Sequence, residues 1–357
     1  MSPQEIVELL RPLCPFYYWP NDGNLGDLLI AEATRQFFRR HGLSFREFHS
    51  EAPPSEKSYA LVYGGGGRFT SHWGPFEEFT QAMTAPAVSR CIILPHSLSG
   101  VDSFILSLDE RCTIICREER SAAYCRSLKP RARIETGDDM ALQAEPGAFP
   151  MAPPPFLRLP KGANKELHRY RKRFNRGRIA AMQRGVRLAT TAASLGGQIR
   201  RVSFLLRTDL EKSAVYTSSR SYDLSMALGF SSCRETPLNG YWMHAFAAAL
   251  RPCDVVVTDR LHVGILSCLL GKEVYLLDND YGKLSNVWRQ SLRDNPGIHL
   301  LPENRFTPEL ETAWQHFNRP LHRFAAGGAR RLGVVCSFFR SYSRLLIGET
   351  RTVTFNE

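Results

Sequence analysis

The chain has 357 residues, of which 43% are apolar and 23% are charged, and it carries a formal net charge of +11. This length predicts two domains of ordinary size, and this composition predicts globular domains with normal hydrophobic cores. The sequence contains no run of about 20 apolar residues, as a membrane helix requires. Its first residues, MSPQEIVELLRPL, lack the basic and then apolar pattern of a signal peptide, so we expect a cytoplasmic protein.

The first 145 residues alternate between strand-like and helix-like segments. Helical periodicity predicts a helix over residues 27–40 with Asp27 as its N-cap, and another helix is expected after Arg117. Strands that alternate with helices indicate βαβ units around a parallel sheet, so residues 1–150 are predicted to form an N-terminal Rossmann-like domain. The expected strands are residues 60–63, 91–95 and 113–116, and residues 134–142 close the set.

Residues 151–201 are expected to connect two domains as a proline-rich linker and a basic helical segment. The linker is indicated by prolines at positions 146, 150, 153, 154, 155 and 160. Between Lys161 and Arg201 the sequence has twelve Lys or Arg and a single acid, Glu166, so this segment carries the whole net charge. It is predicted to be helical from residue 165 to about residue 193 and to end at Gly196-Gly197.

The basic segment allows several interpretations. A solvated basic helix is the simplest, and a surface for anionic lipid headgroups or for a polyanionic substrate is the alternative. A nucleic-acid partner is disfavoured, because only Tyr170 and Phe174 supply aromatic side chains there and the sequence has no recognisable nucleic-acid motif nearby.

Residues 202–325 are predicted to form a C-terminal Rossmann-like domain. Residues 326–357 are expected to form a C-terminal helix that could pack back on the N-terminal domain. Together with the first half, these elements predict an α/β protein. In the second half the expected strands are residues 202–206, 255–258 and 273–277, and the expected helices are residues 240–250, 262–270 and 308–318.

The nine cysteines are scattered and form no CxxC pair. Several lie in apolar strand-like or helix-like runs, so we interpret them as reduced thiols of the core. The sequence offers no clear set of metal ligands, and no metal site is predicted.

Residues 255–267, VVVTDRLHVGILS, carry the strongest functional signal in the chain. An apolar strand ends in a charged cluster, and a helix is predicted to begin immediately afterwards. Ligands of open α/β sheets bind beyond the carboxyl ends of the strands, and a helix N-terminus favours anions. Arg260 is therefore predicted to hold an anion. His262 is predicted to transfer a proton, unless it only caps or packs the helix.

Two more arginines follow predicted strands, Arg117 after residues 113–116 and Arg207 after residues 202–206. One such arginine would mean little, since an exposed salt bridge at a helix start explains it equally well. Buried cations, however, cost free energy unless an anion meets them. Three arginines converging on one cleft, with Arg260 as the third, predict a ligand with several negative charges.

Small and polar residues at other strand ends add candidate binding residues. The NLGD turn and the glycine run after residues 60–63 could hold an anion or a sugar hydroxyl. The loop after residues 273–277 combines carboxylates, an amide, a phenol and a lysine, which suits hydroxyl-rich ligands and phosphate. Turn and capping chemistry explains part of the same pattern. The candidates are Asn24, Asp27, Gly65, Gly66, His96, Asn279, Tyr281, Lys283 and Ser285.

Several of these motifs together resemble the polysaccharide pyruvyl transferases. They are NLGD, YGGGG, REERS, DDMAL, TDRLH and LLGKEVYLLDNDYGKLS, and they span about residues 18 to 290. The resemblance implies a fold like that of the GT-B glycosyltransferases, with two Rossmann-like domains facing a cleft. It also implies transfer of a pyruvyl group from phosphoenolpyruvate onto two hydroxyls of a sugar, with release of phosphate and without a cofactor.

The resemblance further implies roles for individual residues. The cationic residues of the RLH motif and an upstream arginine are taken as donor-binding and catalytic, which here means Arg260, His262 and Arg207, with Arg117 as a further carry-over. Phosphoenolpyruvate bears a carboxylate and a phosphate, for which arginines are suitable receptors. Ketal formation needs a proton at its methylene carbon, for which His262 is the hypothesis. The donor is expected on the C-terminal domain and the acceptor on the N-terminal domain.

The implied partner is a glycan acceptor in the synthesis of exopolysaccharide or another cell-surface glycan. A lipid-linked acceptor would bring the protein to the inner membrane face, where residues 161–201 could contact anionic lipids. Two other functions stay open at this point. One is a GT-B-type glycosyltransferase that uses a nucleotide sugar, and the other is a non-catalytic protein that binds sugar phosphates or nucleic acid.

Overall fold

The structure is a computed structural model, and it describes residues 1–74, 76–149, 176–207, 216, 218–229, 232–278 and 282–319. Residues Met1–Asn318 form one compact unit. The predicted C-terminal helix, the predicted linker and the first part of the basic segment lie outside the described residues. None of the helices in the described part of the chain is long and apolar enough to span a bilayer.

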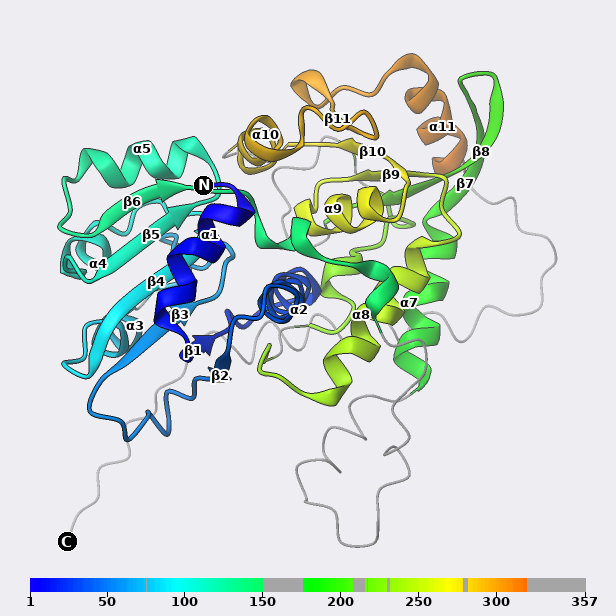
Figure 1. Ribbon diagram of the computed structural model, residues 1–357. Coiled ribbons are helices and arrows are strands. Elements are labelled where there is room, and N and C mark those ends of the chain that lie inside the picture. The colour runs from blue at the N-terminus through cyan, green and yellow to red at the C-terminus, as the bar shows by residue number, and fades with distance from the viewer. Residues whose placement is uncertain are drawn as a thin grey trace, which may run out of the picture. The chain divides into compact units, whose positions relative to one another are not determined.

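The first sheet has six parallel strands in the order β2-β1-β3-β4-β5-β6 (Figure 1). Every pair of neighbouring strands in it is parallel. This confirms the parallel α/β sheet predicted from the alternation of strands and helices. The strands are β1 (Phe16–Trp19), β2 (Phe45–Glu47), β3 (Tyr59–Tyr63), β4 (Val88–His96), β5 (Cys112–Cys116) and β6 (Arg133–Thr136).

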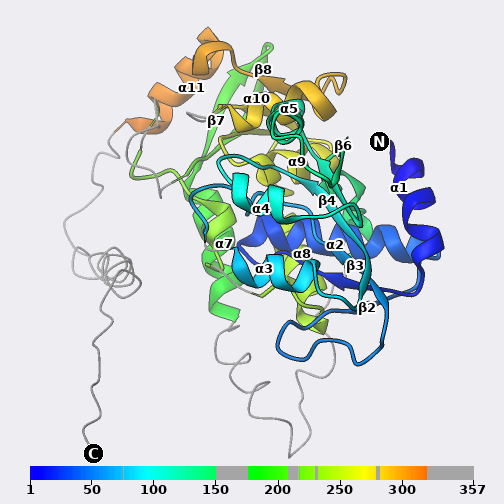
Figure 2. The same cartoon turned by 90° about the vertical axis from the view of Figure 1, so that its left-hand side faces the viewer.

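Helices cover both faces of the first sheet because its strands are apolar on both faces. In β3, Val62 packs in the same core as α1 and α2, whereas Leu61 and Tyr63 pack in the core formed with α3, α4 and α5. Helix α2 accordingly lies behind the sheet when α3 and α4 face the viewer (Figure 2). The helices are α1 (Pro3–Leu10), α2 (Leu25–Arg40), α3 (Glu77–Met83), α4 (Asp102–Ser107) and α5 (Glu119–Ser127).

The second sheet is mixed and has five strands in the order β11-β10-β9-β8-β7. The strands from β8 to β11 are parallel neighbours, whereas β7 runs antiparallel to β8. The strands are β7 (Thr190–Leu195), β8 (Gln198–Leu205), β9 (Val255–Thr258), β10 (Glu273–Leu276) and β11 (Ile298–Leu300).

The prediction of one helix running to residue 193 is wrong. Helix α7 (Arg176–Leu188) ends before Thr190, and the chain then forms the β7–β8 hairpin. Gly196 and Gly197 are the turn of that hairpin, with φ angles of 58° and 75°. A two-residue turn of type I′ needs positive φ at both positions, which glycine adopts without strain. The glycine pair is therefore a hairpin signal and not a helix stop.

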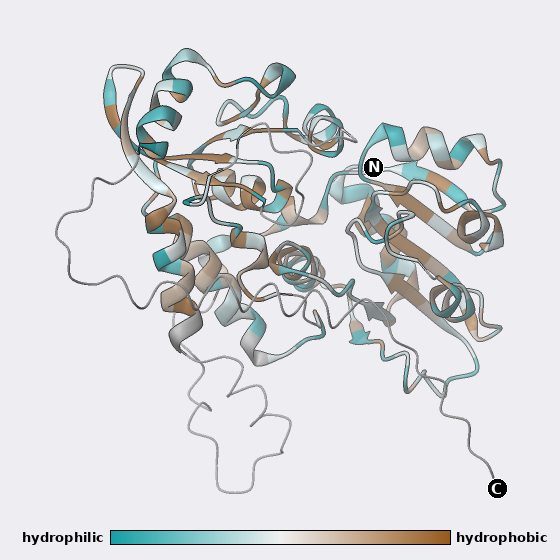
Figure 3. Cartoon of the chain, turned by 180° about the vertical axis from the view of Figure 1, so that it is seen from behind, coloured by the Kyte–Doolittle hydropathy of each residue, from teal (hydrophilic) through white to brown (hydrophobic). Residues whose placement is uncertain are grey.

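A shared core lies between the two sheets. Apolar residues of α2, α8 and α9 belong to one cluster that also contains strand residues of both sheets. The central strands of both sheets are largely hydrophobic (Figure 3). Helix α11 covers the other face of the second sheet with Leu310, Trp314 and Phe317. The remaining helices are α8 (Pro237–Leu250), α9 (Leu261–Leu269), α10 (Lys283–Val287) and α11 (Pro308–Asn318).

The two sheets follow the two halves predicted from the sequence, except that β7 and the start of β8 lie in the segment 151–201. In space, however, both sheets belong to one compact unit with a continuous core. The fold class is therefore α/β with a parallel sheet and a mixed sheet. The GT-B-like arrangement of two domains facing a cleft stays a prediction.

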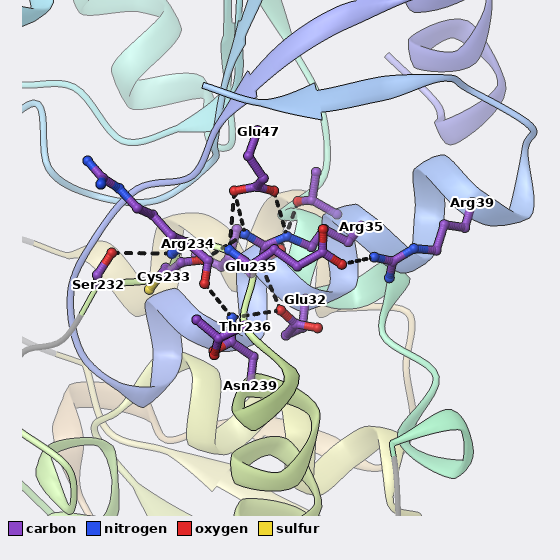
Figure 4. Close-up of polar contacts among 12 residues, drawn as sticks. Glu32, Arg35, Arg39, Glu47, Ser232, Cys233, Arg234, Glu235, Thr236 and Asn239 are labelled. Atoms are coloured by element: carbon purple, nitrogen blue, oxygen red, sulfur yellow. Dashed lines mark hydrogen bonds and ion pairs between the residues drawn. The ribbon is translucent and has the colours of Figure 1, made fainter. Parts of the chain in front are cut away.

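A buried polar cluster around Arg35 also connects the two halves (Figure 4). Arg35 lies on α2 and donates to Glu47 from Nε at 3.0 Å and from Nη2 at 3.1 Å. Its Nη1 donates to Glu32 at 2.5 Å, and Nη2 also donates to the carbonyl oxygen of Cys233 at 2.7 Å. Because Cys233 precedes α8, this cluster ties the segment before α8 to the helix that faces both sheets.

Candidate active site

A fully buried arginine lies at the carboxyl end of the first sheet. Arg117 directly follows β5, and its side chain has no exposed surface. Its Nε donates to Ser97 Oγ at 2.8 Å, and its Nη1 donates to Asp139 Oδ2 at 2.8 Å. The third nitrogen, Nη2, is buried and has no hydrogen-bond partner among the described residues. An unsatisfied buried N–H is costly, so this position favours an anionic ligand.

Gly67 leaves space beside this nitrogen. A Cβ atom on Gly67 would lie 3.1 Å from Arg117 Nη2 and 2.9 Å from Lys283 Nζ. Gly67 ends the glycine run that follows β3, and Lys283 is the first residue of α10. The two cations therefore meet over a piece of backbone without a side chain, and they come from different halves of the chain.

The ammonium of Lys283 lies in surroundings that disfavour its charge, although the residue as a whole is only half-buried. Desolvation and then the charge of Arg117 lower the pKa of Lys283 to about 7, while Asp27 and Glu118 act in the opposite direction. Two cations held together in this way are stabilised by a bound anion. The electrostatics thus support the same conclusion as the unsatisfied N–H group.

His262, the second residue of α9, reaches the same cluster. Its Nε2 lies 3.4 Å from Asp139 Oδ2, the oxygen that also accepts from Arg117. Its Nδ1 edge packs on the first turn of α2, because a Cβ atom on Gly26 would lie only 2.5 Å from Nδ1. The structure therefore brings together the predicted residues Arg117, Lys283 and His262.

Arg260 is paired with Asp223, which was not among the predicted site residues. It directly precedes α9, and its guanidinium forms a two-point ion pair with the buried carboxylate of Asp223, with Nε 3.0 Å from Oδ1. The Arg260 side chain is 11% exposed. This arginine thus has an internal anion as a partner, unlike Nη2 of Arg117.

Arg207 lies near Lys283, since its charge contributes to the lowered pKa of that lysine. Its backbone N–H donates to Asp259 Oδ1 at 2.8 Å. Burial nevertheless raises the pKa of the Asp259 carboxyl to about 6. The loop that precedes α9 therefore carries a partly desolvated carboxylate and Arg260, and the segment after β8 contacts this loop through Arg207.

The predicted binding residues Asn24 and Asp27 form a capping box at the start of α2. Asn24 Oδ1 accepts from the backbone N–H of Gly26 at 2.7 Å, and Asp27 Oδ2 accepts from the backbone N–H of Asn24 at 2.9 Å. The predicted N-cap at Asp27 is wrong, because Asp27 occupies the third helical position. This box shapes the turn on which His262 packs.

The other predicted residues at the end of the first sheet support the glycine run. A Cβ atom on Gly65 would lie 2.7 Å from the carbonyl oxygen of Pro95, and one on Gly66 would lie 2.7 Å from Asn21 Nδ2. His96 Nε2 accepts from the backbone N–H of Arg68 at 2.9 Å, and burial lowers the pKa of His96 well below its usual range. These residues hold the loop that presents Gly67.

In the loop after β10, Ser285 donates through Oγ to the carbonyl oxygen of Gly282 at 3.0 Å. The backbone N–H groups of Leu284 and Ser285 donate to Asp278 Oδ1 at 3.0 and 3.2 Å. Ser285 thus helps to begin α10 and so to place Lys283. The predicted residues Asn279 and Tyr281 lie outside the described residues.

A comparison with models of known protein families assigns the chain to one of them. The model of the polysaccharide pyruvyl transferases matches residues 24–281. The chain belongs to the polysaccharide pyruvyl transferase family. The match includes Gly67, Arg117 and His262, so the site described above lies within the family's shared region, and Lys283 lies two residues beyond it.

Two relatives agree with this assignment at different levels. A curated protein of Bacillus subtilis (strain 168) named “Putative pyruvyl transferase EpsO” is 26% identical over 310 residues, which cover 79% of this chain and 86% of that protein. A crystal structure of the functionally uncharacterized protein KP1_0663 from Klebsiella pneumoniae subsp. pneumoniae NTUH-K2044 has a TM-score of 0.60 and 24% identity. The aligned region covers 84% of this chain and 97% of that protein's chain, and the similarity supports the fold.

The pyruvyl transferase site contains residues that sequence reasoning missed. Asp139, Asp223 and Gly67 are the clearest cases. Asp139 belongs to the DDMAL motif and follows β6, so its place after a strand was a usable signal. No sequence signal connects Asp223 with Arg260, because the two residues are 37 positions apart and Asp223 follows no strand.

The cysteines and the absence of a metal cluster add little to the site of this pyruvyl transferase. Six of the eight described cysteines are buried, which confirms the prediction of core thiols for those six. Within the described part of the chain, no group of three or more His, Cys, Asp or Glu is placed to hold a metal ion.

Proposed function

We propose that this pyruvyl transferase uses phosphoenolpyruvate as its donor and forms a cyclic ketal on two hydroxyls of a glycan. The observation that carries the proposal is the buried Nη2 of Arg117, which has no hydrogen-bond partner among the described residues and lies beside Lys283. A neutral sugar would bring no charge to the buried donor of Arg117. A small ligand with several negative charges would satisfy this donor and would suit a place where two cations lie side by side.

Phosphoenolpyruvate has the charge that such a site requires. Its carboxylate and phosphate lie on adjacent positions, so they need cationic donors from more than one direction. Arg117 and Lys283 supply donors for one anionic group, and Arg207 is the candidate for the other. Anion binding also favours the protonated form of Lys283, whose pKa is lowered to about 7 without a ligand.

The chemical step requires an acid at the methylene carbon of the donor. Protonation there makes C2 electrophilic, two acceptor hydroxyls add to C2, and the bond from C2 to the phosphate oxygen breaks. One proton ends on the methyl group. Of the two hydroxyl protons, one leaves with the phosphate and the other restores the acid. We assign the acid to His262, because its Nε2 points to the cluster of Arg117 and Asp139.

The experiment has a binding arm and a turnover arm. Isothermal titration should show binding of phosphoenolpyruvate in preference to a panel of nucleotide sugars. Incubation with phosphoenolpyruvate and a panel of glycans should release phosphate and add the mass of a pyruvyl ketal to one glycan. Binding of a nucleotide sugar without binding of phosphoenolpyruvate would instead indicate a glycosyltransferase. Wild-type turnover by His262→Ala would contradict the assignment of the acid, and wild-type turnover by Arg117→Ala would contradict the assignment of the donor-binding cation.

The acceptor is a glycan, and its attachment to a lipid is a separate prediction. Within the described part of the basic segment, Arg184 and Arg187 of α7 are exposed and could contact anionic headgroups. Flotation with vesicles of anionic and of neutral lipid tests this prediction. Equal partitioning of the wild type and a charge-reduced variant of residues 161–201 would exclude membrane contact through this segment.

A further inference from the structure

Asp139 occupies a place that the proposed reaction does not yet explain. It lies between β6 and a short 3₁₀ helix, Met140–Gln143, and its side chain is 1% exposed. Its Oδ1 accepts from the backbone N–H of Ala141 at 2.9 Å. Its Oδ2 accepts from Arg117 Nη1 at 2.8 Å and lies 3.4 Å from His262 Nε2. One buried carboxylate oxygen thus faces both the anion-binding arginine and the imidazole.

Asp139 carries a negative charge, which favours a hydrogen on the His262 nitrogen that faces it. Burial alone would favour the neutral acid, but the charges of His262 and Arg117 hold the pKa of the Asp139 carboxyl well below its usual range. The carboxylate is therefore ionised at neutral pH, and an ionised carboxylate only accepts hydrogen bonds. The nitrogen that faces it must carry the hydrogen.

Among the described residues, Asp139 is the hydrogen-bonding partner of the His262 imidazole. The Nδ1 edge packs against the glycine backbone of Gly26, and no hydrogen bond of Nδ1 is found among the described residues. Backbone packing on one edge fixes the position of the ring, and a carboxylate on the other edge fixes its tautomer. A buried carboxylate also orients the catalytic histidine in hydrolases with a Ser-His-Asp triad, although there it binds Nδ1 and the proton is transferred at Nε2.

We infer that Asp139 is a positioning residue that keeps the hydrogen of His262 on Nε2, the nitrogen directed at the anion-binding cluster. This inference rests on the proposed function for its chemical meaning, since the acid is then the imidazolium, which Asp139 stabilises and which returns to the neutral ring when it gives a proton to the methylene carbon. Because Asp139 also holds Arg117, one carboxylate aligns the acid with the group that receives the donor. Asp139 itself neither donates a proton nor contacts the reacting carbon in this scheme.

The first measurement needs no variant and no turnover. Nitrogen-15 NMR of histidine-labelled protein, with the His262 signals assigned by His262→Gln, reports which nitrogen of the neutral ring is protonated. We expect the Nε2–H form in the wild type, and an Nδ1–H form would overturn the inference. This outcome does not depend on whether phosphoenolpyruvate is the donor, so it separates the inference from the proposed function.

The second measurement compares two neighbouring acids. Asp139→Asn is isosteric, and Asp138→Asn is its matched control, because Asp138 accepts from Ser291 Oγ at 2.8 Å instead of contacting His262. We expect turnover at saturating donor to fall on the order of 10²–10⁴-fold in Asp139→Asn, the usual contribution of acid–base catalysis, and to stay near the wild type in Asp138→Asn.

A double variant distinguishes positioning from a general structural effect. If Asp139 acts through His262, kcat at saturating donor should be no lower in Asp139→Asn combined with His262→Gln than in His262→Gln alone, because residues that act as a unit are not additive. The lost contact between Asp139 and Arg117 should appear in KM instead. Multiplied losses of kcat in the double variant would overturn the inference. A wild type that shows the Nε2–H tautomer but no turnover of phosphoenolpyruvate would leave the inference standing and refute the proposed donor.

Discussion

Two buried arginines, Arg35 and Arg117, show how this molecule treats a charge in its structural core and in its site. Both side chains have no exposed surface. Every guanidinium nitrogen of Arg35 donates to an internal acceptor, as Figure 4 shows. Arg117 has acceptors for Nε and Nη1, but Nη2 has none among the described residues, and Lys283 brings a second cation to it.

The difference teaches that burial alone does not identify a functional cation. Arg35 is compensated by two carboxylates and a carbonyl oxygen, so its charge contributes to structure. Arg117 is compensated only in part, and its remaining donor is the one to which we assign an anion under the proposed function. Replacing Arg35 should therefore lower stability, whereas replacing Arg117 should lower activity. Five predictions test this difference.

Replacing Arg35 should have the largest effect on stability. Arg35→Leu should lower the free energy of unfolding by about 3–5 kcal/mol, because it leaves Glu32 and Glu47 half-desolvated without their cation. Urea denaturation measures this loss. The folded fraction should keep its affinity for phosphoenolpyruvate, and a selective loss of that affinity would refute the structural role of Arg35.

Replacing Arg117 should mainly affect the reaction. Arg117→Lys should lower kcat/KM for phosphoenolpyruvate by about 10²–10³-fold, because lysine cannot supply the forked donors that hold both Asp139 and an anion. The matched control is Arg35→Lys, which should keep kcat/KM. Steady-state kinetics of the two variants test the contrast, and equal losses of kcat/KM would break it.

Adding one methyl group at Gly26, where His262 packs on α2, should lower turnover. Gly26→Ala places a Cβ atom 2.5 Å from His262 Nδ1, so the imidazole must shift. A displacement of about 1 Å lowers turnover on the order of 10²-fold. Gly147→Ala is the control, since no atom lies within 4 Å of a Cβ there. Unchanged kcat in Gly26→Ala would show that the position of His262 is not critical.

The lowered pKa of Lys283 should appear in the pH dependence of stability. The pKa falls from 10.5 to about 7 on folding, so the unfolded chain binds more protons between these values, and stability rises with pH there. Relative to Lys283→Met, the wild type should gain at most about 1.4 kcal/mol per pH unit between pH 8 and 10. Parallel pH profiles of the urea midpoint would show that the ammonium is not desolvated.

Replacing Arg39, at the exposed edge of the Arg35 cluster, should have the smallest effect on stability. Arg39 forms an ion pair with Glu235 in Figure 4, and their side chains are 52% and 43% exposed. Arg39→Ala should therefore change the free energy of unfolding by less than about 1 kcal/mol. A loss comparable with that of Arg35→Leu would mean that exposure does not separate the two arginines.

Much of the site could be predicted from local sequence. The strand Val255–Thr258 and the helix that places His262 in its first turn follow from an apolar run, a charged cluster and a second apolar run. Arg117 and Lys283 were candidates because they follow strands. Local patterns failed at Gly196-Gly197, because a glycine pair can end a helix or form a hairpin turn. They also failed at Asn24 and Asp27, because both residue types are common N-caps.

The sequence by itself determined the α/β class, the strand and helix around His262 and the polysaccharide pyruvyl transferase family, because periodicity and motifs are properties of neighbouring residues. Only the tertiary structure decided which charges compensate one another. Asp139 meets His262 across 123 positions of the chain, and Arg260 meets Asp223, whereas Nη2 of Arg117 has no acceptor among the described residues. The physical reason is that the cost of a buried charge depends on the atoms around it, and those atoms come from segments that only folding brings together.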